Sequence, residues 1–369
     1  MSSKSRKWLL LALGALIVAF LLFRYRGRIH LGEIWNAARS ANPWYLLGGV
    51  VLIYVCYFLR AVRWRNFQKY VGNASLFPIF TLTMAGFSAV FLFGRVGEPV
   101  RPLLLSRRDK VPVADIFGIY ALERVLDLGF SFVVLASWFC IVTVEKYLNP
   151  AAASPALEGI RRTAGTIVAA GIVGASALLI YLRTHGAAMV GGRLEVWVAH
   201  HGWRAKVARI VLGVGRGLKT IRTFRDLLYA LAVSAVHWFL IILVYYVVML
   251  GFGGKLATLR FQDSMLVLAL TLVGSMLQLP GIGGGPQAVM VGAFTRFYGV
   301  SSETAVAAAM VIYLITFAVV TFAGVPVLLK EGLSLGELRR MREEEEKEVD
   351  AEIISHSSEA PKPASASDC

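Results

Sequence analysis

The sequence is poor in charge. Of its 369 residues only 17% are Asp, Glu, Lys or Arg, whereas 57% are hydrophobic, and the mean hydropathy is +0.65. A soluble domain needs a polar surface in contact with water and rarely combines so few charged residues with so many hydrophobic ones. The apolar runs are continuous and do not alternate with polar residues, which argues against the strands of a membrane β-barrel. We therefore expect an all-α, polytopic transmembrane helix bundle.

Cysteine and recognisable catalytic motifs are also scarce. Cys56, Cys140 and Cys369 form no spaced motif, so a disulfide framework is not expected. There is no Walker motif and no cluster of His or Cys, whereas a transferase needs an acid–base or metal constellation. We expect no catalytic residue, no metal and no cofactor. The net charge of +15 does not indicate nucleic acid, because the basic residues lie mostly in short loops, as the positive-inside rule requires.

Long apolar runs predict about six full membrane spans. These are residues 8–23, 43–59, 113–144, 163–182, 227–250 and 304–329. Two shorter apolar runs end in glycines, and we expect the segments 79–105 and 264–299 to re-enter the membrane without a full crossing. The transmembrane domain thus covers residues 1–329. A polar tail, residues 330–369, is predicted to be disordered.

Loop charge orients the predicted spans. Residues 183–226 carry nine Lys or Arg against two acids, which places this loop in the cytoplasm. Residues 145–162 and 251–263 carry few basic residues and are expected outside. The scheme places the protein in the cytoplasmic membrane with both termini on the cytoplasmic side. The basic residues of 24–28 then lie on the outer side, against the rule.

A glycine break occurs twice, and each break follows a short apolar run. The first is G-R-V-G-E-P, residues 94–99, and the second is G-I-G-G-G-P, residues 281–286. Two interrupted hydrophobic segments at matching positions are typical of an inverted-repeat transporter. Glycine permits the broken backbone, and proline fits the first turn of the next half-helix, whose free N–H groups suit an anion. The residues assigned to these breaks are Gly94, Gly97, Pro99, Gly281, Gly284 and Pro286. Two ordinary Gly-Pro loops are the alternative.

Ionisable residues stand inside a predicted span. Glu123 and Asp127 are four residues apart and share a helix face, and Arg124 can pair with Asp127. Such groups need partners or a water-filled cavity. The natural partners are Arg95 and Arg101, which follow the first glycine break. A structural salt bridge that locks two helices remains the alternative.

Other polar residues receive simpler interpretations. Glu98, between the two arginines of the first break, is expected to line the same polar site. Arg60, Arg63 and Arg65 follow the span 43–59 directly and are predicted to be basic residues at the membrane surface. His237 is alone in the middle of a span and is interpreted as a packed, hydrogen-bonded histidine.

Four motifs in order resemble those of the lysylphosphatidylglycerol synthase transmembrane region family. They are LRAVRWRNF, FGRVGEPVRPLLL, ALERVLDL and LPGIGGGPQA, and the resemblance runs from about Trp44 to Leu329. It implies a flippase-like bundle of broken helices that handles a lipid with a charged or phosphorylated head group. The motif match implies that the substrate-binding residues are Arg95, Glu98, Arg101, Glu123, Arg124, Asp127 and Gln287. Relatives often carry glutamate where Gln287 stands, so a cationic head group is not implied. About 40 polar residues follow the last span, so we do not expect the acyltransferase domain of the full synthases.

The sequence thus predicts a lipid flippase or transporter of the cytoplasmic membrane. Its expected partner is a phospholipid or polyprenyl-phosphate lipid with a charged head group, and a homo-oligomer is compatible with the sequence. Two alternatives stay open: a non-enzymatic accessory or scaffold protein, and an integral membrane transferase acting on a lipid phosphate.

Overall fold

The computed structural model describes residues 31–72, 74–148, 157–171, 173, 222–279 and 283–331. The predicted span 8–23, nearly all of the basic loop 183–226 and the tail after residue 331 lie outside these residues. The helices and strands in chain order are α2 (Leu31–Ser40), α3 (Pro43–Gln68), α4 (Leu76–Phe93), the 3₁₀ turn η1 (Gly94–Gly97), α5 (Val100–Asp109), α6 (Val113–Leu148), α10 (Phe224–Phe252), α11 (Gly254–Ala257), α12 (Phe261–Gly274), the 3₁₀ turn η3 (Ser275–Leu277), β1 (Gln278–Leu279), β2 (Gly283–Gly284), α13 (Gly285–Arg296), α14 (Ser302–Tyr313), the π-helical turn η4 (Leu314–Ala318) and α15 (Val319–Lys330). Residues 157–171 are also helical.

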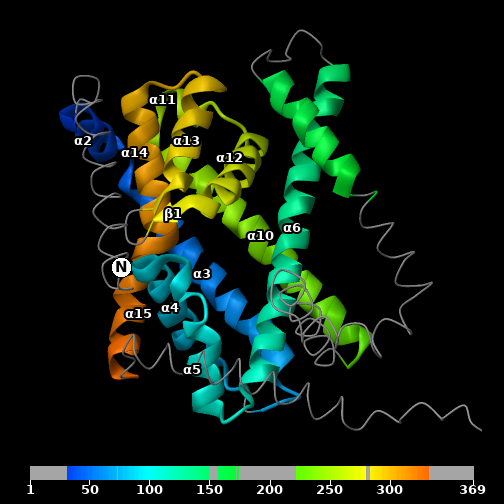
Figure 1. Cartoon of the computed structure of the whole chain (residues 1–369). Coiled ribbons are helices and arrows are strands. Elements are labelled where there is room, and N and C mark those ends of the chain that lie inside the picture. Colours follow the sequence, from blue (N-terminus) through cyan, green and yellow to red (C-terminus); the bar gives the residue numbers. More distant parts are fainter. Residues whose placement is uncertain are drawn as a thin grey trace, which may run out of the picture.

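The described chain is a bundle of apolar helices (Figure 1). Five are long and apolar enough to cross a membrane: α3, α4, α6, α10 and the continuous helix 302–330. The expected all-α polytopic fold is confirmed. Four of the predicted spans, 43–59, 113–144, 227–250 and 304–329, coincide with these helices.

Helix α4 differs from the prediction. The sequence predicts that the segment 79–105 re-enters without a full crossing, but α4 starts earlier, at Leu76, and has 18 residues. Pro78 stands in its first turn, where proline's missing N–H is not needed for a helical hydrogen bond. By length and composition α4 alone is therefore a candidate span.

The chain nevertheless doubles back directly after α4. The turn η1 leads into α5, which packs against α4 so closely that a Cβ atom on Gly86 would clash with the side chain of Arg101. The helices α12 and α13 form a second hairpin, joined by η3 and the short antiparallel pair β1–β2. Both segments that the sequence predicts to re-enter therefore fold as hairpins.

The two hairpins start from opposite ends of the bundle. The base of the first lies where α3 ends, because Gln68 of α3 is hydrogen-bonded to Asp109 of α5. The base of the second lies where α6 ends, because Arg260 before α12 pairs with Glu145 of α6. The tips meet, since η1 lies against β1. This is the relation that an inverted repeat requires.

Glycine makes both tips possible. Gly94 ends α4 with φ of 64°, and Gly284 precedes α13 with φ of 82°, a region that residues with a Cβ rarely adopt. Pro99 then caps α5, and Pro286 lies in the first turn of α13. The two prolines thus stand at the helix starts where the sequence predicts them.

Candidate functional site

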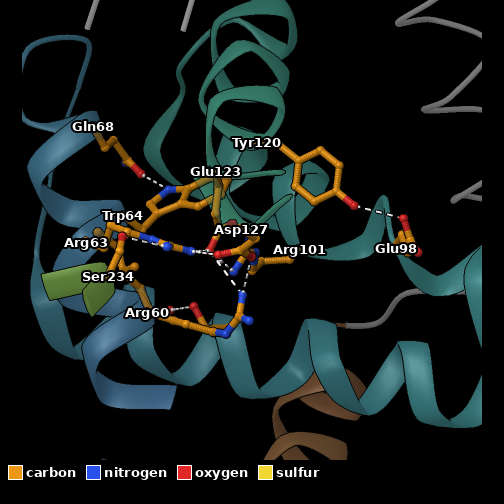
Figure 2. Close-up of polar contacts among 12 residues, drawn as sticks. Arg60, Arg63, Trp64, Gln68, Glu98, Arg101, Tyr120, Glu123, Asp127 and Ser234 are labelled. Atoms are coloured by element: carbon orange, nitrogen blue, oxygen red, sulfur yellow. Dashed lines mark hydrogen bonds and ion pairs between the residues drawn. The ribbon is translucent and has the colours of Figure 1, made fainter. Parts of the chain in front are cut away.

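An ion-pair cluster lies inside the bundle, where α3, α5 and α6 meet (Figure 2). Its acids, Glu123 and Asp127, lie one turn apart on α6 and are 1% and 9% exposed. Its cations are Arg60 and Arg63 of α3 and Arg101 of α5. Because α6 starts at Val113, Glu123 lies about 15 Å along the helix at 1.5 Å per residue.

Asp127 is held by the two arginines of α3. The Nη2 atom of Arg63 lies 2.8 Å from Oδ1 of Asp127, and Nη1 of Arg60 lies 3.0 Å from Oδ2. Arg63 also donates to Oε1 of Glu123 at 2.8 Å and to the hydroxyl of Ser234 on α10 at 2.9 Å. Arg63 therefore connects three helices.

The interpretation of Arg60 and Arg63 as membrane-surface residues is wrong. Helix α3 does not end at Leu59 but continues to Gln68, and positions 60 and 63 share the face that packs on α6. Arg63 is only 1% exposed. Arg65, on the other side of the same helix, is exposed, as the prediction requires.

Arg101 completes the cluster, and it pairs with Glu123 as the sequence predicts. Its guanidinium also lies 4.3 Å from the ring centroid of Trp64, with Phe87 and Tyr120 at 5.7 and 5.9 Å. Cation–π contacts of this kind stabilise a desolvated arginine by about 2 kcal/mol. Gly86 allows α5 to come close enough to α4 for this arrangement.

The cluster holds three cations against two anions, so its net charge is positive. A buried charge that loses its partner costs about 3–5 kcal/mol. The hydrogen bonds from Arg60, Arg63 and Arg101 to the two carboxylates offset the desolvation of all five groups. The arrangement is a polar junction of three helices inside an apolar bundle, with Arg60 at its border to the cavity.

The remaining predicted polar residues form a second, smaller group. The hydroxyl of Tyr120 donates to Oε2 of Glu98 at 2.9 Å, and the guanidinium of Arg124 lies 4.7 Å from the centroid of the Tyr120 ring. Arg124 is exposed, and its guanidinium stacks on Tyr120, which lies one turn earlier on α6. The sequence had suggested a different partner for Arg124, namely Asp127. The side chain of Arg95 and the residue Gly281 lie outside the described residues.

A cavity of about 220 Å³ lies next to the ion-pair cluster. Its polar lining includes Arg60, Glu98 and Arg124, and Pro286 brings the N-terminus of α13 to its wall. One water needs about 10–15 Å³ of such space, so the cavity can hold several waters or a polar group of comparable size. It is lined by both hairpins and by α3, α6 and α10. Gln287 is next to Pro286 but does not line it.

The cavity opens toward the flank of the bundle at Arg124. This residue lines the cavity and is exposed at the same time. Large apolar side chains around the hairpin tips and on α6 are exposed as well. They are Leu92, Phe93, Val125, Leu128, Met276 and Leu277.

Sequence reasoning missed several lining residues. His237 and Trp238 of α10 and Tyr57 of α3 face the cavity, and only the histidine gave a signal, as an ionisable residue in mid-span. No group of three or more His, Cys, Asp or Glu side chains lies together as a metal site within the ranges described above.

Comparison with known proteins identifies the family. The model of the lysylphosphatidylglycerol synthase transmembrane region matches residues 8–324. The chain belongs to this family. It is also 27% identical over 321 residues to a UPF0104 membrane protein of Methanothermobacter thermautotrophicus, covering 83% of this chain and 91% of that one. A UPF0104 membrane protein of Methanocaldococcus jannaschii is 27% identical over 141 residues, 36% of this chain and 42% of the relative. No solved structure matches the chain. This multi-pass membrane protein thus shares its family with the transmembrane region of lysylphosphatidylglycerol synthase.

Proposed function

We propose that this member of the family is a non-enzymatic transporter that moves a lipid with a phosphate or otherwise anionic head group across the cytoplasmic membrane. The observation that carries the proposal is the cavity at the junction of two hairpins from opposite ends of the bundle, lined by Arg60, Glu98 and Arg124. Broken helices that meet at a polar cavity are the recurring substrate site of secondary transporters.

The exposed mouth suits a lipid. A lipid must keep its chains in the bilayer while its head group enters a polar space. At Arg124 the cavity reaches the flank of the bundle, and exposed apolar side chains of both hairpin tips lie nearby. The head group would occupy the cavity, and the chains would lie against Leu92, Phe93, Met276 and Leu277.

The charge of the lining favours an anion. Two arginines, Arg60 and Arg124, and one acid, Glu98, line the cavity, and Arg60 belongs to a cluster whose net charge is positive. The N-terminus of α13 adds a partial positive charge at Pro286. Along α3 and α10 the cluster contacts at Arg63 and Ser234 lie beyond the lining residues Tyr57 and His237, toward the end of α3 and the start of α10.

A lipid-translocation assay tests the proposal. The purified chain is reconstituted into vesicles with tail-labelled anionic lipids, and access of dithionite to the label is followed. The wild type should move the lipid faster than empty vesicles do. Glu98→Gln should slow it about fivefold, because Tyr120 would then donate to a neutral amide oxygen and the charge assistance, worth about 1 kcal/mol, would be lost.

The matched control is Glu33→Gln on α2, an exposed carboxylate that does not line the cavity. It should move lipid at the wild-type rate. If vesicles with the wild-type protein translocate lipid no faster than empty vesicles, the proposed transport function is refuted. It would favour the accessory or scaffold protein, which the fully paired ion cluster also suits as a clamp between helices.

A further inference from the structure

A second hollow, of about 870 Å³, lies between the last turns of α3 and the first turns of α10. It shares no lining residue with the cavity at the hairpin tips, so it is a separate site. Its charged lining residues are Arg65, Lys69, Arg225 and Asp226. The hollow therefore carries three cations against one acid.

The acid of this lining is already neutralised. Asp226 is 5% exposed, Lys69 pairs with its Oδ1 atom, and the hydroxyl of Tyr70 donates to Oδ2 at 3.0 Å. The Oδ2 atom also accepts from the backbone N–H of Thr223, as part of the capping box that starts α10. Lys69 and Asp226 thus cancel each other's charge and join the two helices.

The two arginines of the hollow are left over. Arg65 and Arg225 are both exposed, and neither forms an ion pair within the part of the chain that the structure describes. A guanidinium can donate two parallel hydrogen bonds to one carboxylate. The hollow is therefore suited to a ligand with at least two carboxylates or other anionic groups.

The same chain carries such a ligand in its tail. Residues 331–369 hold 11 of the 23 acids of the whole sequence. Seven of these stand between Glu343 and Glu352, with a single lysine among them. A block of like charges that does not belong to a packed domain is often an interaction segment.

The tail leaves the bundle within reach of the hollow. Val327 of α15 packs on the same apolar cluster as Trp64 of α3, and in Figure 1 α15 ends on the same side of the bundle as α5. Helix α15 contacts α4, and α4 contacts α3. Neighbouring helix axes lie about 8–10 Å apart, so the ends of α15 and α3 are about 20 Å apart. The 12 residues between Lys330 and Glu343 can span up to about 40 Å.

We propose that the acidic segment 343–352 of this chain docks in the hollow, with its glutamates on Arg65 and Arg225. A single exposed ion pair is weak, but a tethered segment has an effective concentration of about millimolar and can form several pairs at once. This favours the tail over an anion that is free in solution. Docked there, the tail bridges the ends of α3 and α10, the helices that carry Arg63 and Ser234 of the ion-pair cluster. The contact does not depend on the proposed lipid transport.

Photo-crosslinking in the full chain tests this contact. Benzoylphenylalanine replaces Tyr229, which lines the hollow and is 47% exposed, and the protein is irradiated in nanodiscs that contain phosphatidylglycerol. Mass spectrometry should find this position joined to a peptide from the segment 343–352. The yield should fall several-fold when the salt concentration rises from about 0.05 to about 0.5 M, because salt screens exposed charges.

Charge variants show whether the arginines hold the segment. Arg65→Gln together with Arg225→Gln should remove the crosslink. The matched control is Arg108→Gln together with Lys110→Gln, which removes the same two charges from exposed positions outside the hollow and should preserve the yield. Glutamine should also remove the crosslink when it replaces four tail residues, Glu343, Glu344, Glu345 and Glu346.

An exchange of charges completes the test. Arg65→Glu together with Arg225→Glu should abolish the crosslink, and lysine at the same four tail positions should then restore it. A wild-type crosslink to phospholipid alone would overturn tail docking and make the hollow a lipid site. No crosslink to either, or a yield that the arginine variants leave unchanged, would equally overturn it.

Discussion

Glu123 is the acceptor shared by the whole ion cluster. Arg63 lies 2.8 Å and Arg60 3.4 Å from its Oε1 atom, and Arg101 contacts Oε2. A single carboxylate at 1% exposure thus fixes the relative positions of α3, α5 and α6. The cost of burying it is offset only while its partners stay in place.

Arg63→Ala should destabilise the protein strongly. The substitution removes one partner each from Glu123, Asp127 and Ser234 and leaves the carboxylates underpaired in an apolar surrounding. The expected loss is about 3–5 kcal/mol, measured as a lower melting temperature of the detergent-solubilised protein.

Arg65→Ala is the matched control for this loss. It removes the same charge from the same helix at an exposed position, where substitutions change stability by about 0.5 kcal/mol or less. Equal melting temperatures for the two variants would mean that the cluster is not a structural junction.

The sequence predicted three of the five residues of this cluster. Glu123, Asp127 and Arg101 stood out because ionisable residues at membrane depth need partners, and the pairing of Arg101 with Glu123 is confirmed. Arg60 and Arg63 were missed because a hydropathy pattern ends a span at its first charges. The helix itself has no reason to stop there, and its continuation to Gln68 turns two apparent surface residues inward.

At the scale of elements, the sequence predicted the glycine breaks but not how the segments on either side of them pack. Spacing in the sequence indicated where α4 ends and where α5 and α13 begin, since glycine and proline act locally. It did not indicate the end of α12, which lies at Gly274, before the second glycine break. The contact between η1 and β1 joins segments far apart in the sequence. The residues of α10 that line the cavity were likewise hidden, because an apolar run around His237 and Trp238 reads as an ordinary span.

Gly97→Ala should impair the first hairpin without any change in charge. A Cβ atom at this position would press on the backbone of Ala89 and lie 2.7 Å from the backbone nitrogen of Val90, so the tip must shift. Overpacking of this kind costs about 1–3 kcal/mol. The melting temperature should fall, and so should the lipid-translocation rate, because Val90 and Glu98 line the cavity on either side of the turn.

Gly129→Ala provides the comparison for this variant. A Cβ atom on Gly129 of α6 would meet nothing within 4 Å, so stability should be unchanged or slightly higher. If Gly97→Ala behaves like Gly129→Ala, the tip of the first hairpin tolerates displacement and its close packing does not hold the cavity in shape.

At the scale of the whole molecule, helix ends gather in two sets. One set holds the ends of α3, α5 and the helix 302–330 and the starts of α4, α6 and α10, with Lys69 of the α3 end paired to Asp226 of α10. The other holds the start of α3 and the end of α10, which are joined by a backbone hydrogen bond from Asn42 to Gly251, and the base of the second hairpin. These are the two sides that the predicted topology requires.

Basic residues mark the first set. The described residues there include Arg65, Lys69, Arg107, Arg108, Lys110, Arg222, Arg225 and Lys330. The basic loop 183–226 also leads to the start of α10 in this set, so by the positive-inside rule we expect this end to face the cytoplasm. The first hairpin would then enter from the cytoplasm, and the ion cluster would close the cavity on that side.

Cysteine labelling in intact cells checks this orientation. In a background with Cys56, Cys140 and Cys369 replaced by serine, a single cysteine at Lys110 tests the basic end, and one at Lys255 tests the opposite end. Both positions lie at helix ends near the surface of the bundle, so both should react with a membrane-impermeant thiol reagent once the cells are lysed. In intact cells Lys255→Cys should label and Lys110→Cys should not, because the reagent cannot reach the cytoplasm. The reverse pattern would invert the molecule: the first hairpin would then enter from outside, and the cluster of Arg63, Glu123 and Asp127 would close the cavity from the external face.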